Sequence, residues 1–488
     1  MGVFFKKAAQ GMAITAFVVI LLTFVDGQLA FTTGIAAAAA VLSVLLFRLT
    51  ESLSDTTCRR LQVLLCLLQT VFMAVLAWQL AVEPAWDFGR VYQGVLDITT
   101  NGRLTYTNGY FMSCYNNFFL AWILAFPFKV LSVFGIGPLA AGILLNIAAI
   151  VLGCGLLMLA ADLWFSWQRG TFFGFSVLCF LPLLTCAPIF YTDTLSMPFA
   201  SFGAFIIVLY VKEKIPRRWR FVVAAVSGIV LFVGFKIKPT SLVPALALAI
   251  GALLWQGKRV WKYLFAAVIS MLLAVAVYGA LEQHSGVIDL TELSNDHLTT
   301  PHYIMMGLKG TGGYNLDDHM FSASFATVEE REAANWKEIQ TRLKEYAFGG
   351  YLRFLFGKIR YTWTDGTYFV PNKLNIDPLK DGVLQRWFTS DGDLYYIYRF
   401  VMKGVQLLLA FGMLAAAFSK DQLNWSLCVA VLGIFLFLLV WETRSRYLIN
   451  MIPVFLLLYT SAIERIYRYI GKFRSGRKLQ KERSHACK

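Results

Sequence analysis

Charged residues are scarce in this chain: Asp, Glu, Lys and Arg make up 15% of its 488 residues, against roughly 25% in an ordinary soluble domain. Histidine is rare as well, with 5 residues, and none of the 8 cysteines forms a Cys-x-x-Cys pair. The low charge argues against a soluble globular protein, and the cysteine pattern indicates neither a disulfide framework nor a zinc knuckle.

Long apolar runs make up most of the chain, and 58% of its residues are hydrophobic. A helix needs about 20 apolar residues to cross a bilayer. The sequence therefore predicts an all-α polytopic membrane protein with about 12 to 13 transmembrane helices. The expected spans are 11–26, 29–48, 61–82, 137–161, 171–190, 195–211, 219–235, 239–256, 261–281, 398–418, 424–441 and 447–465.

The surplus of basic residues, 44 Lys and Arg against 29 Asp and Glu, sets the expected orientation. Basic loops of membrane proteins face the cytoplasm and anionic lipid, so nucleic acid is a poor explanation of the charge. If all basic loops are cytoplasmic, both termini lie inside and the apolar run 117–135 is re-entrant or interfacial. The alternative, in which this run spans the cell membrane and one basic loop lies outside, stays open.

This topology divides the chain into parts. We expect an N-terminal helical hairpin, a transmembrane core with a first outer loop, an extracytoplasmic loop domain or lid, three C-terminal spans that begin directly after it, and a basic cytoplasmic tail. Their ranges are 1–60, 61–281 with the loop 83–136, 282–397, 398–465 and 466–488.

Two carboxylates stand at the outer ends of apolar runs: Asp87 in EPAWDFG and Asp193 in YTDTLS. Each alone fits an ordinary helix cap. However, the topology derived from Lys and Arg places both on the same outer face. Charged groups at the edge of the hydrocarbon region usually mark a site, so we interpret the pair as functional.

Four basic residues are expected on the same face. Lys236 and Lys238 flank an outer turn in FKIKPTS, and Arg444 and Arg446 lie in ETRSRY. Arginine presents a planar fork that suits phosphate. Snorkelling lysines and an ion pair with Glu442 are the alternative interpretation. Carboxylates beside an anion site predict a lipid-phosphate leaving group and an acid or base that activates an acceptor hydroxyl.

Further polar residues are weaker candidates. His302 is the loop histidine best placed by sequence to contact a substrate, and no His-x-x-x-His pair predicts a metal site, although a divalent cation stays possible. Tyr110, Tyr115 and Asn116 are expected to line an acceptor groove, or else to belong to the aromatic belt of the membrane interface.

Taken together, these motifs resemble the GT-C class of membrane glycosyltransferases, in the family related to protein O-mannosyltransferases (family 39) and to the aminoarabinose transferase of lipid A. The matching elements are Asp87 in the first outer loop, Asp193 about a hundred residues later, Lys238 before Pro239, and the sequence RSRY from Arg444. The chain departs from the mannosyltransferases at Phe88, where a second acid often stands, and the N-terminal hairpin precedes the family's first span.

The resemblance implies an inverting displacement that moves a sugar from a polyprenyl-phosphate donor to a cell-wall polysaccharide, a teichoic acid or a lipid. Asp87 would act on the acceptor hydroxyl, and Asp193 would position donor, acceptor or metal. Lys238, Arg444 and Arg446, with Lys236 beside them, would hold the lipid phosphate. No Rossmann or P-loop glycine motif indicates a nucleotide.

Other functions remain open at this stage. A transporter or flippase of a lipid-linked saccharide would use the same carboxylates as coupling groups, although such proteins often have two related halves and the region 282–397 has no counterpart in the N-terminal half. A non-catalytic assembly subunit and a hydrolase with water as acceptor are the remaining alternatives.

Overall fold

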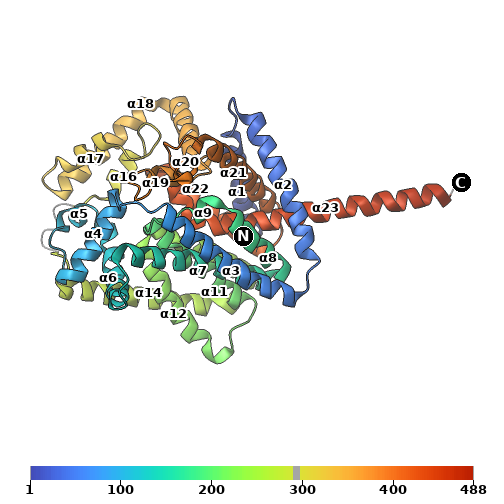
Figure 1. The fold of residues 1–488 in the computed structure, drawn as a ribbon, viewed down its shortest axis with the longest axis horizontal. Helices are drawn as coiled ribbons and strands as arrows, with labels where there is room; N and C mark the ends of the chain where they lie inside the picture. Colours follow the sequence, from blue (N-terminus) through green and yellow to red (C-terminus); the bar gives the residue numbers. More distant parts are fainter. Residues whose placement is uncertain (1, 290–296, 487–488) are drawn as a thin grey trace.

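A computed structural model describes residues 2–289 and 297–486, with side chains described as far as Ile470. Regular structure in these residues is helical (Figure 1). Within this described part of the chain, twelve helices are long and apolar enough to cross a membrane. The predicted all-α, multi-span architecture is therefore confirmed.

The helices follow the chain in this order. The N-terminal part contains α1 Gly2–Leu22, α2 Leu29–Glu51, α3 Asp55–Gln79, α4 Trp86–Asn101, α5 Asn108–Ser113, η1 Tyr115–Asn117, α6 Phe118–Val133, α7 Pro138–Trp164, α8 Trp167–Cys179, α9 Leu181–Leu184, α10 Thr192–Leu195 and α11 Met197–Val211. The remainder contains η2 Arg217–Trp219, α12 Arg220–Ile237, η3 Pro239–Leu242, α13 Val243–Gln256, α14 Lys258–Ser285, α16 Thr300–Met306, α17 Leu316–Ala323, α18 Val328–Trp363, α19 Val370–Leu374, α20 Val383–Phe388, α21 Tyr395–Ala417, α22 Gln422–Val440, η4 Ser445–Met451 and α23 Ile452–Ala486.

Contacts between turns define one end of the helix bundle, which we call the basic end. Turns that are far apart in the sequence bond to one another there. The bonds run from Gln168 to the Leu53 carbonyl, from Lys212 to the Trp164 carbonyl, from Trp164 to Asp421, from Trp425 to the Lys6 carbonyl and from Arg465 to the Ala415 carbonyl. The predicted basic loops thus gather at one end, together with the beginning of α1 and the part of α23 around Arg465.

The apolar run 117–135 forms a helical segment, Tyr115–Val133, that is long and apolar enough to cross a membrane. Its first turn bonds through Asn117 to Tyr191. Its last turn leads within a few residues into α7, whose Gly142 packs against Phe190. Both ends of α6 therefore lie at the end of the bundle opposite the basic end, in agreement with an interfacial or re-entrant segment.

The predicted span 171–190 is interrupted instead of continuous. Helix α8 ends at Cys179, and the short α9 follows with Pro182 in its first turn. Proline cannot continue a helix without losing a hydrogen bond. Gln168 contacts the basic end, whereas the carbonyls of Cys186 and Ile189 accept bonds from Asn146 near Phe190. This broken segment therefore crosses the bundle.

The region after α14 forms the predicted extra layer over the bundle. Helix α16, the turn after it and helix α18 share a small apolar core that includes Met305, Leu308 and Ile339. Within this layer, Arg342 binds both oxygens of Asp318 at 2.8 Å. Lys358 connects the layer to the end of α22, because its ammonium donates to the carbonyls of Gly307 and Leu439.

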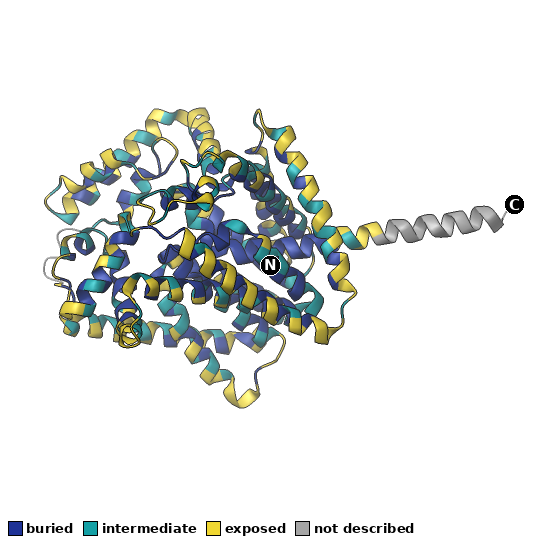
Figure 2. Ribbon diagram, viewed as in Figure 1, coloured by how far each residue is buried: buried dark blue, intermediate teal, exposed yellow. Residues whose placement is uncertain are grey.

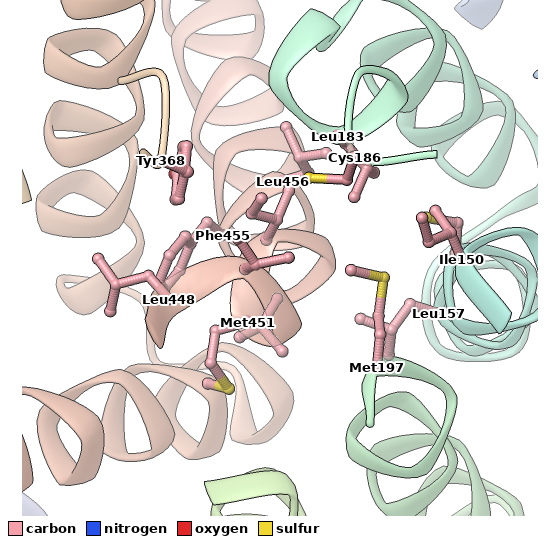
Figure 3. Close-up of a cluster of buried hydrophobic side chains, with 14 of the residues drawn as sticks. Ile150, Leu157, Leu183, Cys186, Met197, Tyr368, Leu448, Met451, Phe455 and Leu456 are labelled. Atoms are coloured by element: carbon pink, nitrogen blue, oxygen red, sulfur yellow. The ribbon is translucent and has the colours of Figure 1, made fainter. Parts of the chain in front are cut away.

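The bundle interior is centred on the last helices, as the buried residues in Figure 2 show. The span Ser445–Ile470 has 94% of its apolar window buried, more than any other described span. Figure 3 shows its residues Leu448, Met451 and Phe455 in the same buried apolar cluster as Leu183 and Met197. Close packing of this kind restricts the position of η4 and its side chains.

The N-terminal hairpin is a pair of helices on the outside of this core. Helix α2 packs on α21 and α23, and only 11% of its apolar window is buried. Of the predicted basic tail 466–488, the structure describes α23 as far as Ala486 and side chains as far as Ile470.

Candidate functional site

Asp193 and Lys238 form an ion pair at the end of the bundle opposite the basic end. Asp193 lies in the single-turn helix α10, and Lys238 stands in extended backbone between α12 and η3, where Pro239 begins the next helix. Lys238 Nζ lies 2.5 Å from Asp193 Oδ1. The side chains are 12% and 7% exposed, so each charge depends on the other for compensation.

Arg446 connects this pair with the second carboxylate. Its guanidinium lies 3.4 Å from Asp193 Oδ2 and 3.7 Å from Asp87 Oδ2. Arg446 stands in η4, directly before the most buried helix, α23. The structure thus brings together Asp87, Asp193, Lys238 and Arg446, which the sequence predicted as one group.

Asp87 is the accessible carboxylate of the group. It lies in the first turn of α4, and its side chain is 41% exposed. Tyr110 donates a hydrogen bond to its Oδ1 at 3.0 Å. Burial raises the pKa of Tyr110, and the neighbouring Tyr191 and Asp87 raise it further, so this phenol stays protonated as a donor.

A chain of side-chain hydrogen bonds fixes the orientation of Tyr110. Tyr191 donates to Asn117 Oδ1 at 3.1 Å, and Asn117 Nδ2 donates to the Tyr110 hydroxyl at 2.6 Å. Since Tyr191 lies two residues before Asp193, this chain links the surroundings of both carboxylates. One oxygen of Asp87 is thereby oriented, and the other faces Arg446.

A small cavity of about 20 Å³ adjoins the group and has room for about one water molecule. Tyr191, Asp193, Lys373 and Arg446 are among its lining residues. Lys373 comes from α19, in the region after α18. Burial lowers the pKa of Lys373 to about 7, and the nearby Arg446 also disfavours its charged form.

Below pH 7, positive charge exceeds negative charge around this cavity. Lys238, Arg446 and, below pH 7, Lys373 carry positive charge, whereas Asp87 and Asp193 carry the negative charge. A bound phosphate would balance the surplus and be held by charge-assisted hydrogen bonds, which are the strongest kind in proteins.

Arg444, the remaining predicted arginine, stacks on the ring of Phe369. Its guanidinium stacks 4.2 Å from the centre of the Phe369 ring, and its buried Nε atom has no hydrogen-bond partner among the described residues. The Phe369 ring is also near-parallel to the ring of Trp86, at 6.5 Å between centroids. Arg444 is thus near the site without an ion pair to Asp87 or Asp193.

The backbone around Phe369 is strained. Trp86, Tyr368 and Phe369 have φ values of 53°, 56° and 59°, in the left-handed region that residues with side chains rarely adopt. Such conformations cost about 1–3 kcal/mol each and concentrate at functional sites. Here they fall next to Asp87 and in the wall of the small cavity.

Other predicted site residues lie apart from the carboxylates. Lys236 sits in an aromatic cage, 4.3 Å from the Tyr278 ring centre and 5.6 Å from that of Tyr115. Tyr115 therefore contacts Lys236 and not Asp87. Asn116 makes a long hydrogen bond, 3.5 Å, to Asn117 Oδ1.

His302 lies inside the layer above the bundle. Its side chain is buried, and its Nδ1 is 2.7 Å from Ser322 Oγ, which donates to Asn335. Burial lowers the pKa of His302 to about 4, with a further contribution from His319. His302 is therefore neutral at pH 7 and packed inside this layer.

The arrangement of the two carboxylates does not fit a divalent cation. Arg446 occupies the space between Asp87 and Asp193, where an ion bridging them would have to bind. Within residues 2–289 and 297–486, no group of three His, Cys, Asp or Glu side chains is placed to hold a metal ion.

Sequence reasoning missed Asn117, Tyr191 and Lys373. Tyr191 directly precedes the predicted YTDTLS element, so its position next to Asp193 was a usable signal. Lys373 lies in a long region whose fold the sequence does not specify, and no spacing connects it to Asp193.

These features define a class: a multi-span integral membrane protein with a buried charge cluster at one end of its helix bundle. The chain belongs to the family described as "Conserved hypothetical integral membrane protein", whose model matches residues 3–467. A search of curated proteins found no match.

Among solved structures, the chain is similar to the crystal structure of ArnT from Cupriavidus metallidurans bound to undecaprenyl phosphate. The two are 15% identical, the alignment covers 83% of this chain and 75% of that chain, and the TM-score is 0.37.

Proposed function

We propose that this protein is a membrane glycosyltransferase of GT-C type, which moves a sugar from a polyprenyl-phosphate donor to an acceptor glycan or lipid. The observation that carries the proposal is the position of Arg446, within 4 Å of an accessible carboxylate and a buried one. A basic anion site next to an oriented, accessible carboxylate is what displacement of a lipid phosphate by a hydroxyl requires.

In the proposed reaction, Asp87 accepts the proton of the acceptor hydroxyl. The hydroxyl oxygen forms a bond to the anomeric carbon of the sugar from the face opposite the phosphate, and the bond from that carbon to the phosphate oxygen breaks. The anomeric configuration is inverted, and the products are the glycosylated acceptor and the polyprenyl phosphate.

Arg446, Lys238 and Lys373 stabilise the departing phosphate, whose charge increases as the bond breaks. Asp193 is a positioning residue, since it holds Lys238 and Arg446 through direct ion pairs. Tyr110 orients Asp87 by a hydrogen bond to one of its oxygens.

The proposal includes the orientation in the membrane. The basic end faces the cytoplasm, as the positive-inside rule requires, so the charge cluster faces the extracytoplasmic side. The termini are then cytoplasmic, and the layer formed by α16, α17 and α18 covers the extracytoplasmic end.

Transfer of labelled sugar tests the proposal. Membranes that contain equal amounts of wild type or Asp87→Asn would be incubated with a panel of radiolabelled polyprenyl-phosphate sugars, and extractable glycan counted. Asp381→Asn is the matched control, because Asp381 is an exposed aspartate that does not line the small cavity. Loss of about a hundredfold in Asp87→Asn alone is the expected result. Equal transfer by wild type, Asp87→Asn and Asp381→Asn would overturn the proposed function.

A flippase is the alternative from another class. It predicts that labelled lipid changes sides of the membrane without losing its sugar. The same membranes distinguish the two functions, because only a transferase releases free polyprenyl phosphate.

A further inference from the structure

A second, much larger cavity lies at the same end of the bundle. Its volume is about 990 Å³, at the upper end of the usual range for ligand pockets. The turn between α1 and α2 forms one wall, and the end of α18 and the beginning of α21 form others. The N-terminal hairpin is therefore part of this cavity.

The second cavity adjoins the catalytic group. Phe369 lines both cavities, and Ser445, which stands between Arg444 and Arg446 in the sequence, lines the larger one. The two cavities thus share Phe369 as a lining residue, and the large cavity lies next to the small one that Lys373 and Arg446 line.

Positive charge exceeds negative charge in the large cavity. Asp26 of the hairpin turn pairs with both Arg360, at 3.0 Å, and Lys403, at 2.5 Å. Arg399 also lines the cavity and makes no ion pair with a described residue. The other lining carboxylate, Asp365, accepts hydrogen bonds from Thr367, from the Phe369 amide and from Ser445.

The remaining lining is polar and aromatic. Tyr361, Tyr395 and Tyr396 present rings with hydroxyl groups, and Asn372 and Ser390 add an amide and a hydroxyl. Rings with polar edges and scattered hydrogen-bonding groups suit a ligand that has both hydroxyl groups and flat apolar faces. A saccharide has both, whereas an acyl chain would require a continuous apolar wall.

We propose that this cavity binds a saccharide that carries a negative group, phosphate or carboxylate, with Arg399, Arg360 and Lys403 as its anion site. Its role as the acceptor site of the transferase rests on the function proposed above. Binding itself does not depend on that function.

Asp26 has a defined part in this proposal. Its carboxylate forms ion pairs with Arg360 and Lys403, in the way an anionic ligand would. Removal of this charge in Asp26→Asn therefore frees two cations, and binding of an anionic sugar becomes tighter. A purely structural role of Asp26 predicts unchanged or weaker binding.

Calorimetric titration of the full chain in phosphatidylcholine nanodiscs tests the proposal. The probes are glucose 6-phosphate, glucuronate and glucose, which share a sugar ring and differ in the negative group. We expect one or both anionic sugars to bind at least tenfold more tightly than glucose, and the comparison of the two identifies phosphate or carboxylate as the preferred group.

The variants locate the binding site. Arg399→Gln should weaken the binding of the anionic sugar about tenfold, and Asp26→Asn should tighten it severalfold. Arg353→Gln is the matched control, since Arg353 is an exposed arginine of α18 that does not line the cavity. Equal binding of glucose and the anionic sugars, or binding that Arg399→Gln leaves unchanged, would overturn the proposal.

The two proposals fail in different ways. If sugar transfer depends on Asp87 but no anionic sugar binds through Arg399, the cavity assignment is wrong and the transferase stands. If anionic sugars bind through Arg399 but no donor yields transfer, the cavity assignment stands and the transferase is wrong.

Discussion

Nζ of Lys238 lies 2.5 Å from Oδ1 of Asp193, and both side chains are largely shielded from solvent. Removal of one member of a buried ion pair leaves the other charge uncompensated and costs about 3–5 kcal/mol. We expect Asp193→Asn and Lys238→Met each to lower the free energy of unfolding by about this amount. The double variant should lose at least about 1 kcal/mol less than the sum of the two. Reversible unfolding in mixed micelles measures this coupling, and strictly additive effects would contradict a direct pair.

Lys373 should give donor binding a pH dependence near neutrality. Its pKa is lowered to about 7 by burial, so it is charged below pH 7 and neutral above. The donor is a phosphate diester and does not titrate in this range. The affinity for donor should therefore fall as the pH rises through 7. Lys373→Arg should flatten this profile, because guanidinium stays charged; the KM for donor measured from pH 6 to 8.5 gives the comparison.

The lowered pKa of Lys373 also makes the free energy of unfolding depend on pH. This free energy rises with pH, whereas the affinity for donor falls. Because the pKa of Lys373 is lower in the folded chain than its ordinary value of 10.5, the unfolded chain binds more protons between about pH 7 and 10.5. The contribution of Lys373 to the free energy of unfolding therefore rises with pH across this window. A comparison of wild type with Lys373→Met at pH 6.5 and 9 isolates it, and a difference that does not change with pH would contradict the shift.

Tyr110→Phe removes the hydrogen bond that orients Asp87 and leaves the ring in place. Hydrogen bonds to charged groups contribute about 1.5–3 kcal/mol, so kcat should fall by about tenfold or more, with little change in the KM for donor. Tyr106→Phe is the control, since Tyr106 is 89% exposed. An equal fall in both variants would show that Tyr110 has no particular role.

Lys236 provides a contrast with Arg446. Since Lys236 is held in an aromatic cage, Lys236→Gln should leave the KM for donor nearly unchanged. Arg446→Gln should raise it strongly, because it removes the charge shared by both carboxylates. Donor titrations of the two variants at equal abundance measure these KM values. A larger increase in KM for Lys236→Gln than for Arg446→Gln would place the phosphate site near Tyr278 instead.

The sequence predicted the site best at charged residues that stand next to long apolar runs. Asp87, Asp193, Lys238 and Arg446 stand at the ends of apolar runs, where a charged residue needs a reason, and the chain folds so that they meet. Apolar periodicity likewise predicted the helices. It could not distinguish α6, which is long and apolar, from a true span. Only tertiary contacts show that both ends lie at one end of the bundle: Asn117 with Tyr191 at the beginning of α6, and Gly142 of α7 with Phe190 after its end.

The remaining site residues depend on tertiary structure. Lys373 and Phe369 come from a region without periodic pattern, and their positions follow from how α18 and α19 pack on the bundle. Lys236 and Lys238 look alike in the sequence, yet different side chains contact them. Lys236 lies among aromatic rings, whereas Lys238 forms an ion pair with Asp193. The large cavity also requires the hairpin turn at Asp26 to meet α21, which no local signal predicts.

The proposed role of Asp87 and Arg446 is the transfer of a sugar away from a lipid phosphate. Its most direct test measures free polyprenyl phosphate released and glycosylated acceptor formed in reconstituted vesicles with wild type and Asp87→Asn. We expect equal amounts of the two products in wild type and about a hundredfold less of both in the variant. Lipid-linked sugar that crosses the bilayer intact, at the same rate in both proteins and without release of polyprenyl phosphate, would contradict it.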